Sequence, residues 1–168
     1  MSLLQVDTRA RTLTAFGHGI ACEIGRSGTI GEAAKREGDG KTPIGDYPIR
    51  GILFRPGRVV PPSGLTLPWR WTRPSDGWSD DVADPLYNRP VTHPWPHSAE
   101  RLQREDGLYD LIVILGHNDR PILPGLGSAI FLHCAIAGRP TAGCVAIAKD
   151  ALLALLPRLA PGDRIAIG

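Results

Sequence analysis

Glycine and proline interrupt this chain so often that long regular helices are not expected. The 168 residues include 20 glycines and 16 prolines, above the usual share of both residue types. Proline lacks a backbone donor and clashes with the preceding helical turn, whereas glycine permits tight turns. Most of the prolines and all four tryptophans lie in residues 55–96, where regular helix is least expected. The pattern predicts many turns and short strands.

Short apolar runs between these turns indicate where the strands lie. Residues 108–116 form the strongest run, which is typical of a strand buried on both faces. The glycine- and charge-rich residues 28–45 are typical of a long surface loop. One helix is predicted over residues 149–159, interrupted by Pro157, and residues 98–102 form at most a short helix. Further strands are predicted at 3–7, 11–15, 19–24, 46–54, 129–132, 145–148 and 164–167.

The overall composition fits one folded domain of ordinary size. With 42% hydrophobic and 21% charged residues, the chain matches neither the disordered nor the membrane-spanning class. Its net charge of +2 is spread along the sequence without a basic run, so nucleic acid is not an expected partner. We predict a single, mostly β domain over residues 1–168, built as a sandwich or irregular barrel with one or two short helices.

The three cysteines, Cys22, Cys134 and Cys144, form neither a Cys-x-x-Cys pair nor a zinc-ligand spacing. Their odd number predicts free thiols, and neither a metal nor an organic cofactor is expected. The first 17 residues do not show the charged segment followed by an apolar run that marks a secretion signal. The sequence leaves both the compartment and the oligomeric state open.

Residues 127–147 carry the pattern most suggestive of chemistry. An apolar run delivers His133, a Gly/Pro loop follows, and Gly143-Cys144 leads into a second apolar run. A hairpin of this kind brings a thiol and an imidazole together for nucleophilic catalysis by cysteine. The amides of Gly143 and Cys144 would then face a developing oxyanion. The alternative is that both are core residues, since a free cysteine usually behaves as a small buried hydrophobe.

The same stretch resembles the active-site segment of the L,D-transpeptidase catalytic domain, the YkuD-like family. The segments GRSGTIGEAAKREGDGKTPIGDYPI and SDGWSDDVADPLYNRPV extend the resemblance over most of the chain. The resemblance matches the nucleophile to Cys144, the base to His133 and the motif threonine to Thr141. Ala142 stands where the family usually has a second histidine, and Ala146 where Asn or Arg is common. The His-to-Cys spacing is also shorter, so the chain resembles a divergent branch.

The resemblance implies a mostly β fold and acyl transfer on peptidoglycan stem peptides. Cys144 would attack the carbonyl of the third residue of a tetrapeptide stem and release the terminal D-alanine. His133 would activate the thiol and then protonate the leaving amine. An amine of another stem would resolve the thioester in a transpeptidase, and water would do so in a carboxypeptidase. The resemblance implies a location in the periplasm or cell envelope. The N-terminal residues of this sequence do not show the signal-peptide pattern that such a location would require.

Five further residues are candidates for substrate binding. His117 and Asn118 follow the buried run 108–116, where a loop supported by the scaffold often carries a site. Arg89 suits a substrate carboxylate, and the indole of Trp78 suits a groove for a peptide or sugar. Each has a plainer interpretation as a turn residue, a surface arginine or a core aromatic. The candidates are Trp78, Tyr87, Arg89, His117 and Asn118.

Two other classes of function remain open. A metal-dependent hydrolase would use His117, His133 and Cys144 as ligands, but the chain has no HExxH-type spacing. A non-catalytic peptidoglycan-binding module is the second alternative, since Ala142 replaces the usual histidine. Loss of activity with a chelator would favour the hydrolase. Ordinary alkylation of Cys144 would favour the binding module, whereas a catalytic Cys144 should react with iodoacetamide faster than Cys22 or Cys134.

Overall fold

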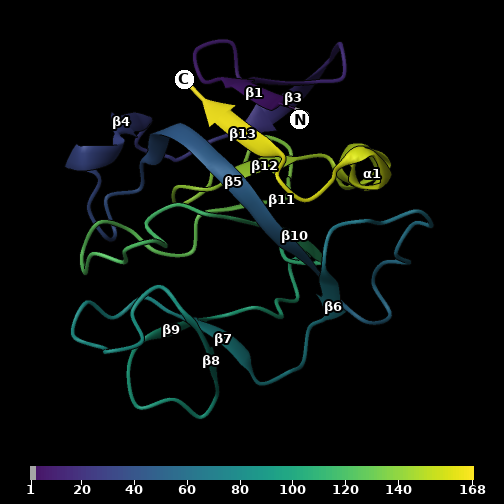
Figure 1. Cartoon of the computed structure of the whole chain (residues 1–168). Helices are drawn as coiled ribbons and strands as arrows, with labels where there is room; N and C mark the ends of the chain where they lie inside the picture. Colours follow the sequence, from purple (N-terminus) through teal and green to yellow (C-terminus); the bar gives the residue numbers. More distant parts are fainter. Residues whose placement is uncertain (1–2) are drawn as a thin grey trace.

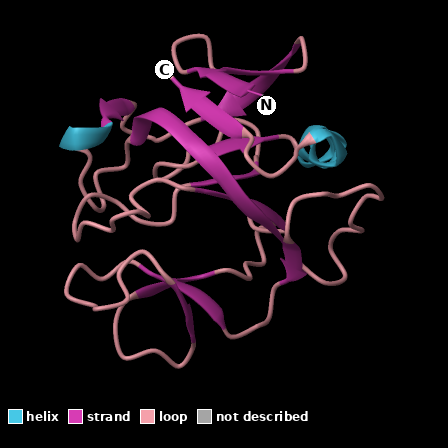
Figure 2. Cartoon of the chain, in the orientation of Figure 1, coloured by secondary structure: helices cyan, strands magenta, loops and turns pink. Residues whose placement is uncertain are grey.

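The computed structural model describes residues 3–168, whose regular elements are mainly short β-strands joined by loops (Figures 1 and 2). The strands are β1 (Leu3–Asp7), β2 (Thr12–Ala15), β3 (His18–Glu23), β4 (Thr29–Gly31), β5 (Thr42–Phe54), β6 (Trp69–Trp71), β7 (Asp76–Ser79), β8 (Pro90–Thr92), β9 (Ala99–Arg101), β10 (Leu111–Leu115), β11 (Phe131–Cys134), β12 (Val145–Ile147) and β13 (Arg164–Ile167). The helical elements are the 3₁₀ turn η1 (Glu32–Ala34), the α-helix α1 (Lys149–Leu155) and the 3₁₀ turn η2 (Leu156–Arg158).

The strands of the larger sheet close into a barrel. Their order is β10-β11-β12-β3-β2-β1-β13-β5-β4, and β5 also pairs with β10, so the path returns to its start. The length of β5 makes this possible, because residues 45–48 pair with β13 and residues 49–54 pair with β10. Figure 1 shows this long strand running diagonally across the molecule. The predicted mostly β fold is confirmed, and of the two predicted arrangements it is the barrel that forms.

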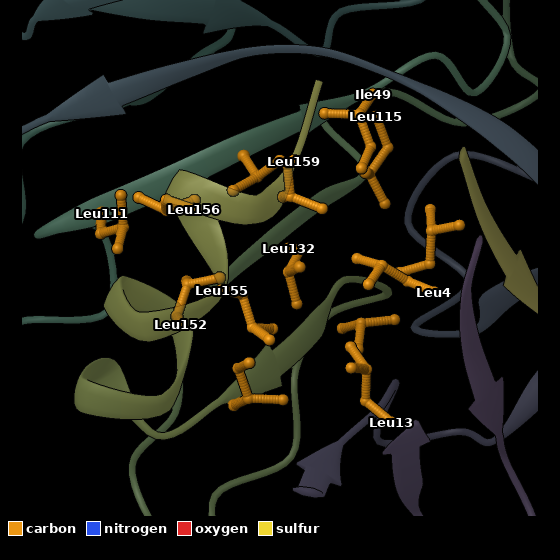
Figure 3. Packing of buried hydrophobic residues seen from close by; sticks show 14 of the residues in the cluster. Leu4, Leu13, Ile49, Leu111, Leu115, Leu132, Leu152, Leu155, Leu156 and Leu159 are labelled. Carbon is orange, nitrogen blue, oxygen red and sulfur yellow. The ribbon is translucent and has the colours of Figure 1, made fainter. Parts of the chain in front are cut away.

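Aliphatic side chains from the strands and the helix fill the inside of the barrel (Figure 3). Each fully buried side chain of this kind contributes about 1.5–3 kcal/mol relative to exposure. Leu132 of β11 lies among the leucines that α1 and the following turn contribute, so the helix supports the strand that carries His133. These leucines are Leu152, Leu155, Leu156 and Leu159.

Several elements differ from the sequence prediction. The proline-rich middle of the chain holds strands β7 and β8, which form a small sheet in the order β8-β7-β9. The short helix allowed at 98–102 is wrong, because Ala99–Arg101 is strand β9 and pairs with β7. This pairing overrides the helix propensity of alanine, glutamate and arginine. The helix predicted over 149–159 ends its α-helical part at Leu155 and continues as η2 around Pro157, as the missing backbone donor of proline requires.

Candidate active site

His133 in β11 and Cys144, directly before β12, line one cleft. β11 pairs with β12 so that His133 lies opposite Ala146, and Cys144 comes two residues before Ala146. Side chains two residues apart point to the same face of a sheet, so the sulfur and the imidazole share a face. The strands are parallel, and the predicted hairpin is therefore wrong. Because the two strands are parallel, the chain between them must run back from the end of β11 to the level where β11 begins. In this connecting segment, Thr141 forms an isolated β-bridge with Gly25.

The turn before Cys144 is held by Thr141 and Gly143. The Thr141 hydroxyl donates to the Cys144 carbonyl at 2.7 Å and accepts from the Gly143 amide at 3.1 Å. Gly143 has a φ of +147°, and a Cβ there would lie 3.0 Å from the Lys41 carbonyl oxygen. Glycine is therefore required by both conformation and space. The Gly143 amide, a predicted oxyanion donor, is occupied by Thr141 in this structure.

The Cys144 thiol is buried and neutral. Its sulfur accepts a hydrogen bond from the Phe131 amide at 3.3 Å and donates to the Ala129 carbonyl at 3.2 Å. Burial, the largest influence, raises the pKa of the Cys144 thiol to about 12. The nucleophile must therefore lose its proton during the reaction, because it does not rest as a thiolate.

The His133 imidazole is a neutral ring beside this thiol. Its Nδ1 donates to the Cys134 carbonyl at 2.9 Å, which leaves Nε2 as the unprotonated nitrogen. Burial lowers the pKa of His133 to about 4, against the smaller opposite effect of the Cys134 and Leu108 carbonyls. At neutral pH the ring is thus in the form that accepts a proton. Within residues 3–168, no hydrogen bond joins the His133 ring to the Cys144 sulfur.

The cleft that holds both side chains has a volume of about 420 Å³. Its lining combines charged side chains of both signs with apolar ones. A pocket of this volume accommodates a small peptide with charged groups at several positions. The charged residues are Arg26, Lys35, Glu37, Asp80, Glu100, Arg104 and Arg139.

The sequence of the chain matches a known protein family. The profile of the L,D-transpeptidase catalytic domain, YkuD, matches residues 2–167. The chain belongs to this family. No curated protein sequence matches the chain. The L,D-transpeptidase family acts on peptidoglycan.

The chain shares its fold with solved structures at low sequence identity. L,D-transpeptidase 3 from Mycobacterium tuberculosis superposes with a TM-score of 0.51 at 13% identity, covering 99% of this chain and 60% of that one. Bd1075 from Bdellovibrio bacteriovorus superposes with a TM-score of 0.50 at 19% identity, covering 99% of this chain and 47% of that one. The chain therefore spans about half to three-fifths of the length of these proteins. The likeness establishes the L,D-transpeptidase fold.

The remaining predicted substrate residues lie outside the cleft with Cys144. His117 and Asn118 line a second cavity, and the Asn118 side-chain amide donates to two backbone carbonyls of its loop. Tyr87 and Arg89 line a third cavity. Trp78 donates to Asn88 and packs edge-on against Phe131, two residues before His133 on the same strand. The structure thus brings together Cys144, His133, Gly143 and Thr141, and separates from them Trp78, Tyr87, Arg89, His117 and Asn118.

Tyr109 and Glu100 also line the cleft, although neither was among the residues predicted from the sequence. Glu100 lies in the segment expected to be a short helix, and Tyr109 comes just before β10. Only the pairing of β7 with β9 and of β10 with β11 places them beside the thiol, and no local motif signals this.

Two other properties of residues 3–168 bear on function. No group of three or more His, Cys, Asp or Glu side chains gathers there to hold a metal ion. His117 lines a different cavity from His133 and Cys144, so the three ligands of the metal hypothesis do not share a site. Over the same residues, no helix has the length and apolar character needed to cross a membrane.

Proposed function

We propose that this L,D-transpeptidase family member is a cysteine acyltransferase acting on peptidoglycan stem peptides. One observation carries the proposal: the Cys144 thiol and a neutral His133 imidazole face one cleft from adjacent strands. A thiol and a proton-accepting ring in one pocket are the minimum for a thioester mechanism. The alternative of a non-catalytic module does not explain why a costly buried imidazole faces that pocket.

In the proposed reaction, Cys144 attacks the carbonyl of the third stem residue while its proton is removed. The sulfur forms a bond to the carbonyl carbon, and the oxygen becomes negatively charged. The Cys144 amide is one donor for this oxyanion, and the Gly143 amide is a second once the Thr141 hydroxyl releases it. Collapse of the intermediate breaks the carbon–nitrogen bond, and the protonated terminal D-alanine leaves. His133 Nε2 accepts and returns protons in this cycle.

The charged wall of the cleft supports a stem peptide as substrate. Such a peptide offers carboxylates and, on a diamino acid, an ammonium group. Arg26, Lys35 and Arg139 provide positive partners, while Glu37 and Asp80 provide negative ones.

Hydrolysis is the second candidate outcome, because water can enter the solvent-accessible cleft and resolve the same thioester. With water as the acceptor, the same thioester gives a tripeptide stem. Transpeptidation requires the acceptor to approach from outside the cleft after D-alanine has left.

Mass spectrometry of muropeptides tests both outcomes. Tetrapeptide-stem muropeptides are incubated with the wild type, Cys144→Ala and, as a matched control, Cys22→Ala, whose thiol lies outside the cleft. We expect crosslinked dimers or shortened stems with the wild type and Cys22→Ala, and neither with Cys144→Ala. Products that persist in Cys144→Ala contradict the proposal. The ratio of dimers to tripeptides then decides between transfer and hydrolysis.

A further inference from the structure

His117 lines a cavity that shares no residue with the cleft around Cys144. This His117 cavity has a volume of about 420 Å³ and is lined by residues 32–33, 116–121, 123 and 126. Gly127 lies between it and the cleft, because an added Cβ there would be 3.1 Å from His117 Nε2 and 3.1 Å from Cγ of Lys35, a cleft residue. The cavity is therefore a separate space beside the cleft, and the proposed acyl transfer does not use it.

One ring nitrogen of His117 has a hydrogen-bond partner and the other has none. The side chain is buried, and Nε2 donates to the Leu126 carbonyl at 3.0 Å. A carbonyl can only accept, so Nε2 carries the hydrogen and Nδ1 of the neutral ring carries a lone pair. Within residues 3–168, this buried Nδ1 is without a hydrogen-bond partner. Buried polar atoms in native proteins are nearly always paired, so a group that supplies the missing hydrogen is expected here.

A carboxylate lies beside this unpaired nitrogen. Glu32 Oε1 is 3.6 Å from His117 Nδ1, and both atoms are hydrogen-bond acceptors while the ring is neutral. Over residues 3–168, the Glu32 carboxylate makes no other ion pair. Its side chain is 56% exposed, so a group arriving from solvent can reach it. The pair of acceptors lacks a donor that would hold the two together.

We propose that the His117 cavity binds an aliphatic primary ammonium group, which donates one hydrogen bond to His117 Nδ1 and another to the Glu32 carboxylate. An ammonium has three hydrogens and a positive charge, so it satisfies both acceptors and offsets the charge of the carboxylate. Apolar side chains in the rest of the lining suit a short alkyl chain. These are Ala33, Pro121, Leu123 and Leu126. The site involves no covalent step and does not rest on the proposed function.

A metal ion fits this cavity less well. Nowhere in residues 3–168 do three or more His, Cys, Asp or Glu side chains gather in a metal-binding group. Asp119 also lines the cavity, but its carboxylate is paired with Arg50 at 2.7 Å. One imidazole and one carboxylate remain, whereas protein zinc sites use three or four ligands.

A proton on Nδ1 is the simplest competitor of the ammonium, because it would occupy the same lone pair. Burial, the largest influence, lowers the pKa of His117, and Lys35 acts in the same direction. The Leu126 carbonyl and Glu32 act in the opposite direction. Tyr47 packs edge-on against the ring and is neutral, since burial raises the pKa of its hydroxyl. The His117 ring is therefore neutral near pH 7, and the lone pair is free to accept.

Arg120 decides which kind of molecule carries the ammonium. Its positive charge lines the same cavity, and the residue is exposed. The guanidinium can turn to solvent beside a simple amine, or it can bind a carboxylate on the same molecule, as in an amino acid. Two probes distinguish these sources: n-butylammonium has no carboxylate, and 5-aminopentanoate adds one at the far end of the same chain.

The test is NMR of the His117 ring nitrogens in the full chain during titration with n-butylammonium near neutral pH, with His117→Gln used to identify the ring signals. We expect an unprotonated Nδ1 that shifts saturably, with a dissociation constant on the order of 1 mM for so small a ligand. The neutral counterpart n-butanol should bind at least about tenfold more weakly. Glu32→Gln should weaken n-butylammonium binding about tenfold. Glu105→Gln is the matched control, since it removes the charge of another exposed glutamate outside the cavity, and it should leave binding unchanged.

Binding should also weaken by about tenfold per pH unit below the pKa of His117, because the proton and the ammonium compete for Nδ1. Tighter binding of 5-aminopentanoate identifies an amino acid as the occupant, and equal or weaker binding identifies an amine; both support the site. A His117 ring that is protonated on both nitrogens near neutral pH overturns the proposal, as does the absence of a saturable shift. Unchanged binding in Glu32→Gln, or tighter binding of n-butanol or Zn²⁺ than of n-butylammonium, overturns it as well.

Discussion

His133 and Cys144 lie on one face of adjacent parallel strands and line one cleft, but each side chain is hydrogen bonded to a backbone carbonyl. His133 Nδ1 donates to the Cys134 carbonyl and Cys144 Sγ donates to the Ala129 carbonyl. Both groups are neutral in this arrangement, since burial lowers the pKa of the imidazole and raises that of the thiol. The resting site is therefore uncharged at its centre, and charge appears only during the reaction.

The three cysteines should differ in reactivity because of access. Burial raises the pKa of Cys22 and Cys134 to about 11 and that of Cys144 to about 12, so ionisation does not favour Cys144. Of the three, Cys144 alone lines the cleft. We expect iodoacetamide to modify Cys144 first in the folded protein, by about tenfold or more. Equal labelling rates of all three thiols in the folded protein contradict this expectation.

Removal of the Thr141 hydroxyl should affect both stability and activity. Thr141→Val loses the hydrogen bonds to the Gly143 amide and the Cys144 carbonyl, which should lower the free energy of unfolding by about 1–2 kcal/mol. It should also lower kcat, because the turn that positions the nucleophile is loosened. The matched control is Thr66→Val, which removes a hydroxyl that donates to the Leu159 carbonyl. Urea unfolding and muropeptide turnover should show a stability loss in both variants and an activity loss in Thr141→Val alone.

Gly143→Ala should be more destabilising than alanine at another glycine with positive φ. The new Cβ would meet the Lys41 carbonyl at 3.0 Å, in a backbone conformation that L residues rarely adopt. Gly138→Ala has a φ of +72° but no atom within 4 Å of the new Cβ. It should therefore cost about 1 kcal/mol from conformation alone. The midpoint of thermal unfolding should be much lower for Gly143→Ala than for Gly138→Ala. A lower midpoint for Gly138→Ala would contradict the role assigned to the turn before Cys144.

The buried His133 should make the folded protein sensitive to acid. Burial lowers the pKa of this histidine from 6.5 to about 4, so the unfolded chain binds its proton at a higher pH than the folded protein does. The free energy of unfolding should thus be at its full value above about pH 6.5 and fall as the pH drops towards 4, by at most about 3 kcal/mol from this group.

Urea unfolding of His133→Gln checks the origin of this loss. The variant should lose less stability than the wild type between about pH 7 and about pH 4, because its side chain does not titrate. His117 is also buried with a lowered pKa, so a residual acid sensitivity is expected in the variant. A pH dependence identical to that of the wild type contradicts the assignment to His133.

Elements whose structure depends on neighbouring residues could be predicted from the sequence. The apolar run around β10 and the break of the last helix at Pro157 both follow from nearby residues. The Cys144 and His133 pair was also found from its position between two apolar runs, and the structure places both in one cleft.

Features that depend on long-range pairing were missed. The runs before His133 and after Cys144 would be equally apolar in parallel and in antiparallel strands, so the sequence pattern could not show their direction. The predicted hairpin was wrong because the two strands are parallel. Ala99–Arg101 has helix-forming residues, and only its pairing with β7 makes it a strand. Glu100 and Tyr109 were overlooked for the same reason, since strand pairing brings them to Cys144 from different parts of the sheet. His117 follows an apolar strand as a site residue often does, but the structure directs it to another cavity.

The most direct test of the central claim is the intact mass of the protein after brief mixing with a tetrapeptide-stem muropeptide and acid quenching. We predict an adduct with the mass of the stem lacking D-alanine, mapped to Cys144 by peptide sequencing and absent from Cys144→Ala. Release of D-alanine without any adduct on Cys144, or the same adduct in Cys144→Ala, would contradict a thioester at this residue.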